Sequence, residues 1–287
     1  MTDSLYVYAE PLLKHLYPDF ESFSEEEKEN ILEKIAHIYQ NVVTKSYDKL
    51  ALECFNTPQH KFEMKTEVII RSAYFRSTRR YAQWITKEKG RSVQKLDIKG
   101  LEFKKSNFPP ILGEFFEEVL VDVLKGAKEE EIVERVKALK NQVLTGEIPI
   151  LKLGNPVAVK TLNFYIGKKA EKDELFSIAK KGAPAPVKAA IIYNDLLKYY
   201  KLNGKHSYIS NGDKIKWLYM KSNSLNIKAI AYLDFDLPER ILKFMEQYVD
   251  RQHIFDSIIL NKIEGFFEDL GWELSLNKYK EEFFDFN

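Results

Sequence analysis

Residues 62–105 decide the fold class, because they contain three β-prone runs: FEMKTEVIIRSAYF (62–75), RRYAQWITKEKG (79–90) and VQKLDIKGLEFKK (93–105). These runs are rich in β-branched and aromatic residues, which favour strands. Lys89-Gly90, between the second and third runs, has the composition of a tight turn. The pattern predicts a small antiparallel sheet in this part of the chain.

Helical spacing occurs on both sides of this region. Before it, Ser24 and Glu27 form a capping box, and apolar residues then recur at intervals of three and four: Ile31, Ile35, Ile38 and Val42. After residues 106–110, helices are expected over 112–123, 129–143, 187–202 and from Pro238 to about residue 270. Further strand-like runs are LYVY (5–8), DKIKWLYMK (213–221) and LNIKAIAYL (225–233). The sequence therefore predicts an α+β fold: a small antiparallel sheet with packed helices, followed by a mainly helical part with a small β portion.

The composition is that of a globular protein. The 287 residues are 45% hydrophobic and carry a net charge of +1, and no run approaches the roughly 18 apolar residues of a membrane-spanning helix. The first residues lack the basic and apolar regions of a secretory signal. Cys54 is the only cysteine, and its neighbours Leu52 and Phe55 suggest that it is buried. A cytoplasmic protein with no membrane partner is expected.

Charge is segregated along the chain. Residues 65–105 contain twelve Lys and Arg against four Asp and Glu, whereas residues 264–287 contain two Lys against seven acids. The basic block is interleaved with aromatic residues, among them Tyr74, Phe75 and Tyr81. Such a block is either a solvated surface or a surface that follows a nucleic-acid backbone.

Four stretches carry the functional information: Thr2-Asp3-Ser4-Leu5-Tyr6-Val7; Met64-Lys65-Thr66-Glu67-Val68-Ile69 with Thr78-Arg79-Arg80-Tyr81-Ala82; Lys99-Gly100-Leu101-Glu102-Phe103-Lys104-Lys105-Ser106; and Glu281-Glu282-Phe283-Phe284-Asp285-Phe286-Asn287. In this order and at these separations they resemble the B-family DNA polymerases of the T-even-phage type. The resemblance covers nearly the whole chain. It implies the C-terminal part of the polymerase palm over residues 1–105, the thumb over 106–274 and a clamp-binding tail over 275–287.

The first stretch resembles the end of the family's Y-G-D-T-D-S hairpin. The resemblance implies that Asp3 binds two Mg²⁺ ions, which activate the primer 3′-hydroxyl and neutralise charge on the pyrophosphate that leaves the dNTP. Glu67 falls on a family glutamate near these metals. Asp3 and Glu67 are therefore the implied catalytic residues.

The second and third stretches imply contacts with primer-template DNA. Arg79, Arg80 and Tyr81 fall on a K-K-R-Y-A element that holds the primer end, although the family usually has lysine at the positions of Thr78 and Arg79. In the third stretch, the residues that would contact the duplex backbone are Lys104, Lys105 and Ser106. In the thumb, Lys188 replaces an arginine of a segment that approaches DNA.

The last stretch resembles the peptide by which these polymerases bind their sliding clamp. The resemblance implies clamp contacts by Phe283, Phe284 and Phe286. The alternative is that these aromatic residues dock on the chain's own thumb.

The family comparison further implies an N-terminal polymerase fragment as a partner, carrying the exonuclease, the fingers and the rest of the palm, in the cytoplasm of a phage-infected bacterium. Thr2 has the hydroxyl that an intein needs at its downstream junction, and whether the halves are spliced or only associate stays open. Two other hypotheses are a non-catalytic primer-template and clamp-binding module, and an unrelated α+β interaction protein whose matches are coincidental.

Overall fold

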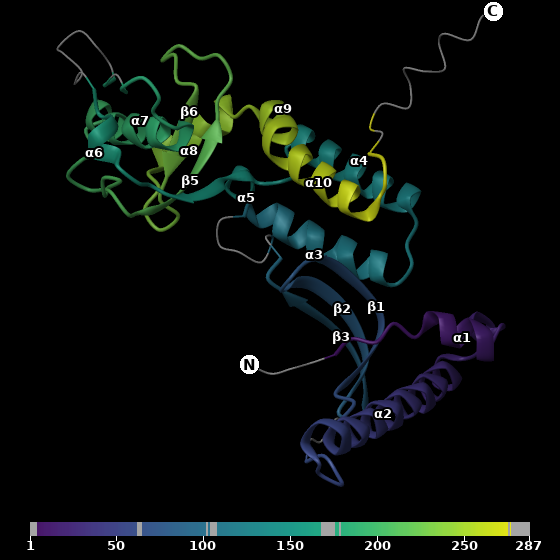
Figure 1. Cartoon of the computed structure of the whole chain (residues 1–287). Coiled ribbons are helices and arrows are strands. Elements are labelled where there is room, and N and C mark those ends of the chain that lie inside the picture. Colours follow the sequence, from purple (N-terminus) through teal and green to yellow (C-terminus); the bar gives the residue numbers. More distant parts are fainter. Residues whose placement is uncertain are drawn as a thin grey trace, which may run out of the picture. The chain divides into compact units, whose positions relative to one another are not determined.

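The computed structural model describes residues 5–61, 65–101, 103, 108–167, 176–177, 179–274 and 276, and the chain divides into two compact units, Met1–Lys99 and Gly100–Asn287. Each unit contains helices and an antiparallel three-stranded sheet, which confirms the predicted α+β fold class (Figure 1). The predicted boundary between residues 105 and 106 lies outside the described residues. Within these ranges no helix is both long and apolar enough to cross a membrane.

Unit 1 begins with three helices: α1 (Glu10–Leu16), the short 3-10 helix η1 (Phe20–Ser22) and the long α2 (Glu25–Phe55). The predicted capping box starts α2: the Ser24 hydroxyl accepts a hydrogen bond from the Glu27 backbone N–H, and the Glu27 carboxylate accepts one from the Ser24 backbone N–H. Residues of α1 and η1 pack on the first half of α2, around Leu13, Ile31 and Ile35.

The predicted sheet of unit 1 is formed by β1 (Val68–Ser77), β2 (Arg80–Glu88) and β3 (Arg91–Lys99), in that order. Lys89 and Gly90 make the two-residue turn between β2 and β3. Their φ angles are 49° and 77°, and a type I′ hairpin turn requires positive φ at both central residues. The predicted turn is therefore confirmed.

Polar side chains join α2 to this sheet. The pairs are Glu25 with Arg71, Glu29 with Ser92, Glu33 with Lys87 and Gln40 with Thr66. A helix that covers a sheet usually buries an apolar face against it. The contact between α2 and the sheet is thus more polar than an ordinary core.

Unit 2 is mainly helical, as predicted. Its helices are α3 (Pro110–Leu124), α4 (Glu129–Thr145), α5 (Ile150–Leu153), α6 (Leu162–Tyr165), α7 (Ala185–Tyr199), α8 (Glu239–Tyr248), α9 (Arg251–Ile254), the π-helical η3 (Phe255–Leu260) and α10 (Asn261–Leu270). Its sheet consists of β4 (Asn155–Ala158), β5 (Lys214–Tyr219) and β6 (Ala229–Tyr232), all antiparallel. The strand-like runs predicted at 213–221 and 225–233 correspond to β5 and β6.

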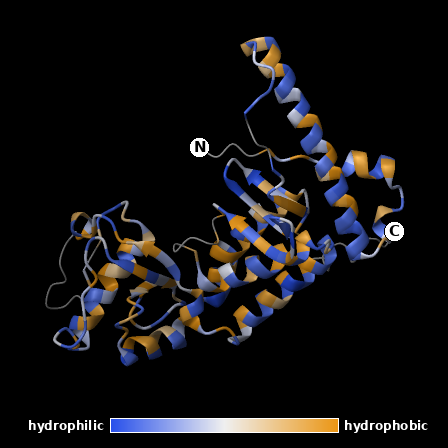
Figure 2. Cartoon of the chain, turned by 90° about the horizontal axis from the view of Figure 1, so that it is seen from below, coloured by the Kyte–Doolittle hydropathy of each residue, from blue (hydrophilic) through white to orange (hydrophobic). Residues whose placement is uncertain are grey.

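The two units differ in how much apolar surface they bury. In the described part of unit 1 the buried hydrophobic residues are Leu13, Ile31, Ile35, Ala51, Tyr74, Ala82 and Ile85, and all other buried hydrophobic residues belong to unit 2. Most of the exposed large hydrophobic residues lie in unit 1: Leu5, Tyr6, Val7, Tyr8, Leu16, Ile38, Val42, Leu50, Leu52, Phe55 and Phe75. In Figure 2, hydrophobic and hydrophilic residues alternate along the whole length of α2. Unit 1 therefore has a small core for its size.

Two local expectations are wrong. The β-prone run Leu5–Tyr8 forms no strand with any described residue and stays exposed. Cys54 is exposed, not buried, because its neighbours Leu52 and Phe55 are themselves 57% and 73% exposed. Both errors arise where hydrophobic side chains are not covered by the chain's own described residues.

Candidate nucleic-acid interface

The end of the β1–β2 hairpin presents arginine side chains to solvent. Ser77 pairs with Arg80, so Thr78 and Arg79 alone make the turn. Arg79 has a φ of 64°, in the left-handed region that costs a side-chain-bearing residue about 1 kcal/mol. Arg79 and Arg80 are both exposed. The two arginines therefore lie at the tip of the β1–β2 hairpin.

An aromatic cluster lies beside this tip. Phe75 pairs with Tyr81 across the two strands, and their ring centroids are 5.6 Å apart. Tyr6, from the segment before α1, lies 5.4 Å from Phe75 and 6.1 Å from Tyr81, measured between ring centroids. A hydrogen bond with Tyr81, then burial and the nearby Tyr81 and Asp97, raise the pKa of Tyr6 to about 12. Tyr6, Phe75 and Tyr81 thus form one aromatic cluster at this end of the sheet.

Two further cations belong to the same end of the sheet. Arg76 lies at an irregularity of β1 between Phe75 and Ser77 and is exposed. Lys99 pairs with Tyr81 from β3, and its ammonium group is 3.9 Å from an Asp97 carboxylate oxygen. The hairpin tip, Arg76, Lys99 and the three aromatic rings together form what we call the hairpin-end surface.

The basic block of residues 65–105 thus has two structural roles. Arg71 and Lys87 form ion pairs with Glu25 and Glu33 of α2, and Arg76, Arg79 and Arg80 are exposed at the hairpin end. Guanidinium groups bind phosphate oxygens, and exposed aromatic rings pack on sugars and bases. This arrangement can hold a nucleic-acid backbone without reading its sequence.

Glu67 does not share this site. It directly precedes β1, and its backbone carbonyl accepts a hydrogen bond from the Lys89 N–H at the opposite hairpin. The ten residues of β1 separate Glu67 from Thr78, which at about 3.3 Å per residue is roughly 30 Å. The structure therefore does not bring Glu67 together with Arg79, Arg80 and Tyr81, as a metal site at the primer end would require.

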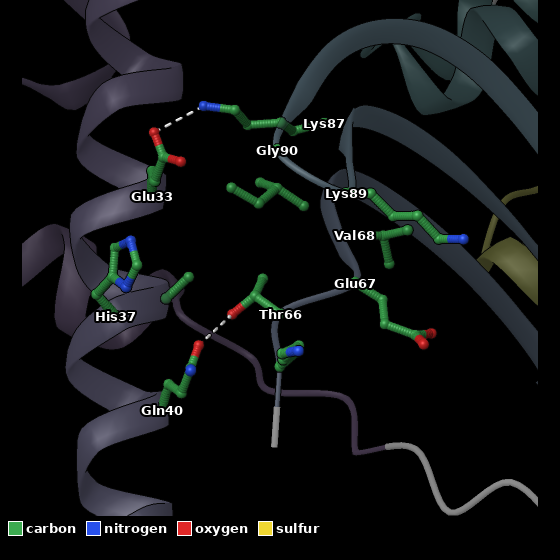
Figure 3. A pocket seen from close by; sticks show the side chains of 12 residues that line it. Glu33, His37, Gln40, Thr66, Glu67, Val68, Lys87, Lys89 and Gly90 are labelled. Atoms are coloured by element: carbon green, nitrogen blue, oxygen red, sulfur yellow. Dashed lines mark hydrogen bonds and ion pairs between the residues drawn. The ribbon is translucent and has the colours of Figure 1, made fainter. Parts of the chain in front are cut away.

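A pocket of about 490 Å³ lies near Glu67, between α2 and the start of β1 (Figure 3). The Glu33 carboxylate points across it to the Lys87 ammonium, 2.7 Å away, and the Thr66 hydroxyl donates to Gln40 at 3.3 Å. The Glu67 side chain points away from α2. Among the described residues no three His, Cys, Asp or Glu side chains are grouped as a metal site would need. Carboxylate oxygens are ligands that Mg²⁺ favours. Of the two carboxylates that line this pocket, Glu33 is paired with Lys87, whereas Glu67 is exposed to solvent.

The other predicted site residues are placed as follows. Lys188 is exposed in the first turn of α7, in unit 2. The remaining predicted site residues lie outside the described residues: Thr2, Asp3, Lys104, Lys105, Ser106, Phe283, Phe284 and Phe286. Their roles stay predictions.

Sequence reasoning did not assign Tyr6, Phe75, Arg76 or Lys99 as site residues, although the last three belong to the basic block of residues 65–105. Phe75 and Tyr81 are opposite each other because the irregularity at Arg76 shifts the register by one residue, a feature that the sequence signal did not specify. Tyr6 was a visible aromatic residue in a β-prone run, but its partners come from a distant segment.

No protein-family model matches the chain, and no curated protein matches its sequence. A function is therefore inferred from the hairpin-end surface and the sequence motifs alone.

Proposed function

We propose that the chain is the C-terminal part of a DNA-directed DNA polymerase of the B-family type, with residues 1–105 as the end of the palm, 106–274 as the thumb and 275–287 as a clamp-binding tail. The observation that carries the proposal is the hairpin-end surface, in which the motif residues Arg79, Arg80 and Tyr81 lie beside Tyr6. In the sequence, Tyr6 follows the proposed metal ligand Asp3 by three residues. The proposal therefore assigns the metal site and the primer grip to one reaction.

In this proposal each residue has a separate task. Arg79 and Arg80 bind phosphates at the primer end, and Tyr81, supported by Phe75 and Tyr6, packs against the terminal nucleotides. Asp3 supplies a carboxylate oxygen, the hard ligand that Mg²⁺ prefers. When bound, Mg²⁺ activates the primer 3′-hydroxyl and stabilises the leaving pyrophosphate. Glu67 lies at the other end of β1 from Arg79 and Arg80, and its proposed place near the metal ions stays a prediction.

The proposal includes partners. A two-metal site needs carboxylates in addition to Asp3, which we assign to an N-terminal polymerase portion with the exonuclease and the fingers. Lys104, Lys105, Ser106 and Lys188 would bind duplex backbone, and Phe283, Phe284 and Phe286 would bind a sliding clamp. The enzyme would work in the cytoplasm of a phage-infected bacterium.

Reconstitution tests the proposal. The purified chain alone should not extend a primer, because it contributes only part of the metal site, and adding the N-terminal portion with Mg²⁺ and dNTP should restore template-directed extension. Extension of a labelled primer, followed on a gel, measures both. Incorporation by the chain alone contradicts the proposal, and tight binding of primer-template without extension in the mixture favours the non-catalytic module.

Replacing Arg79 with glycine should separate the fold from DNA binding. Glycine relieves the left-handed backbone at this turn and should stabilise unit 1 by about 0.5–1 kcal/mol. Loss of the guanidinium should weaken binding of all primer-template sequences alike and reduce the salt dependence by about 0.9 for the one lost phosphate contact. Fluorescence anisotropy over a salt series measures the change.

Lys89→Gly is the matched control. Lys89 is also an exposed cation at positive φ, 49°, but it lies at the opposite hairpin. This substitution should give a similar gain in stability and leave the salt dependence unchanged. Equal losses of affinity for both variants would mean that the sheet has no specific DNA-binding end.

A further inference from the structure

The loop between β6 and α8 presents Phe235 to solvent. The side chain is 80% exposed, more than any other large hydrophobic residue in the described part of the chain. The next residue, Asp236, anchors this loop, because its carboxylate accepts hydrogen bonds from His206 Nδ1 and the Ser207 backbone N–H, each at 2.6 Å. Its backbone carbonyl accepts a third from the hydroxyl of the buried Tyr193 at 3.0 Å. Phe235 is therefore exposed on a loop that three hydrogen bonds hold in place.

Three more aromatic side chains come from the segment to which this loop is bound, the end of α7 and the residues after it. In this segment Tyr199 and Tyr208 are 46% and 39% exposed. The ring of Tyr200 lies 5.0 Å from that of Tyr199, measured between centroids. The Arg240 guanidinium, from the first turn of α8, lies over the Tyr200 ring at 4.1 Å from its centroid. Because β6 also packs on α7 (Figure 1), these segments belong to one end of unit 2.

This end of unit 2 carries positive charge that its own acids do not neutralise. Lys201, Lys205 and Arg240 are exposed, and none of them forms an ion pair with a carboxylate in the described part of the chain. The acids of α7, of the β6–α8 loop and of the first turn of α8 already have basic partners: Asp195 with Lys198, Asp234 with Lys216, Asp236 with His206 and Glu239 with Lys243. We call the three cations, together with Phe235, Tyr199, Tyr200 and Tyr208, the α7–α8 surface.

Cations without carboxylate partners beside exposed aromatic rings match the chemistry of one ligand. Lysine and arginine bind phosphates, and exposed rings stack on bases, which a single strand offers and a duplex keeps inside. We propose that the α7–α8 surface binds single-stranded nucleic acid, with its three cations on phosphates and Phe235 stacked on a base. The hairpin-end surface of unit 1 takes no part in this binding, so the inference does not rest on the proposed polymerase function.

The test uses the full chain and a fluorescently labelled oligodeoxythymidine of about 15 nucleotides, whose binding is followed by anisotropy. Phe235→Ala should weaken binding about fivefold or more, because one stacked base loses its ring. Phe235→Leu should weaken it as much, since leucine keeps an apolar side chain but has no ring, whereas Phe235→Trp should retain binding. Lys201→Ala with Lys205→Ala should reduce the salt dependence by about 1.4, because each phosphate contact with a single strand contributes about 0.7.

Phe55→Ala is the matched control, because Phe55 is 73% exposed at the end of α2 in unit 1. It should bind the oligonucleotide like the unchanged chain, and the Phe235 variants should bind a blunt-ended duplex within twofold of the unchanged chain. The inference is overturned if Phe235→Ala or the double lysine variant binds the oligonucleotide as the unchanged chain does. It is equally overturned if Phe235→Leu retains binding, which would assign Phe235 to an apolar protein contact, or if the duplex loses as much affinity as the single strand. Because no primer extension is involved, each of these results leaves the polymerase proposal standing.

Discussion

Replacing Asp3 with alanine should abolish nucleotide incorporation by the reconstituted polymerase while primer-template binding stays nearly unchanged. The carboxylate is the proposed Mg²⁺ ligand, and the metal ions contribute several kcal/mol of transition-state stabilisation, so that the rate should fall about a thousandfold or more. The phosphate contacts come from other residues, Arg79 and Arg80, which the substitution does not touch. Rapid-quench measurement of single-nucleotide addition at saturating dNTP gives the rate, and fluorescence anisotropy gives the DNA affinity.

Asp19→Ala is the control for this experiment. Asp19 is an exposed aspartate of the same unit, before η1, and its side chain caps no helix. Its loss should change the rate less than twofold. Turnover by the Asp3 variant within tenfold of the unchanged enzyme would remove Asp3 from the mechanism, and a parallel loss of DNA affinity would point to misfolding instead.

The sheet of unit 1 could be predicted because its strands and the turns between them are neighbours in the sequence. Three β-prone runs are joined by short turns, and Lys89-Gly90 adopts the positive φ angles that a type I′ hairpin turn needs. The capping box at Ser24 and Glu27 likewise depends on residues three apart, so its outcome was fixed by the local sequence. Features of this kind need no knowledge of the rest of the fold.

The expectations of a strand at Leu5–Tyr8 and of a buried Cys54 are wrong for a common physical reason, since both concern what covers a side chain. The long helix α2 shows the same effect: Ile31 and Ile35 are buried beside α1, whereas Ile38 and Val42, in the same row, are exposed. Spacing identifies an apolar face but does not say how far its cover extends.

The separation of Glu67 from the arginines has a different origin. The family resemblance implies that Glu67 and Arg79 belong to one active site, and eleven residues lie between them in the sequence. In an extended strand that interval is roughly 40 Å, whereas Tyr6, far away in sequence, contacts Tyr81 directly. Motif spacing becomes spatial proximity only after the register of the strands is known.

Replacing Gly154 with alanine should strongly destabilise unit 2. Gly154 lies between α5 and β4, and a Cβ there would overlap the hydroxyl of Tyr232 and come within 3.0 Å of Tyr232 Cζ and Lys216 Cβ. Tyr232 is fully buried, and its hydroxyl donates to the Leu151 carbonyl at 3.2 Å, so the ring has no free space into which to move. Overpacking costs about 1–3 kcal/mol and the disturbed hydrogen bond about 1 kcal/mol more. A loss of about 3 kcal/mol should lower the melting temperature by roughly 6–12 °C.

Two comparisons make this result specific to the contact with Tyr232. Gly265→Ala, inside α10, adds a Cβ that would meet no atom within 4 Å, and it should be neutral or stabilising by up to about 1 kcal/mol. Tyr232→Phe removes the overlapping hydroxyl, so Gly154→Ala should cost less in the Tyr232→Phe background than in the unchanged chain. Urea unfolding of the unchanged chain and the four variants, with hydrogen exchange of β5 and β6 as a local readout, measures these differences. If Gly154→Ala lowers the free energy of unfolding equally in both backgrounds, the Tyr232 hydroxyl is not the reason why glycine is needed at this position. If Gly154→Ala lowers it no more than Gly265→Ala does, glycine is not needed there at all.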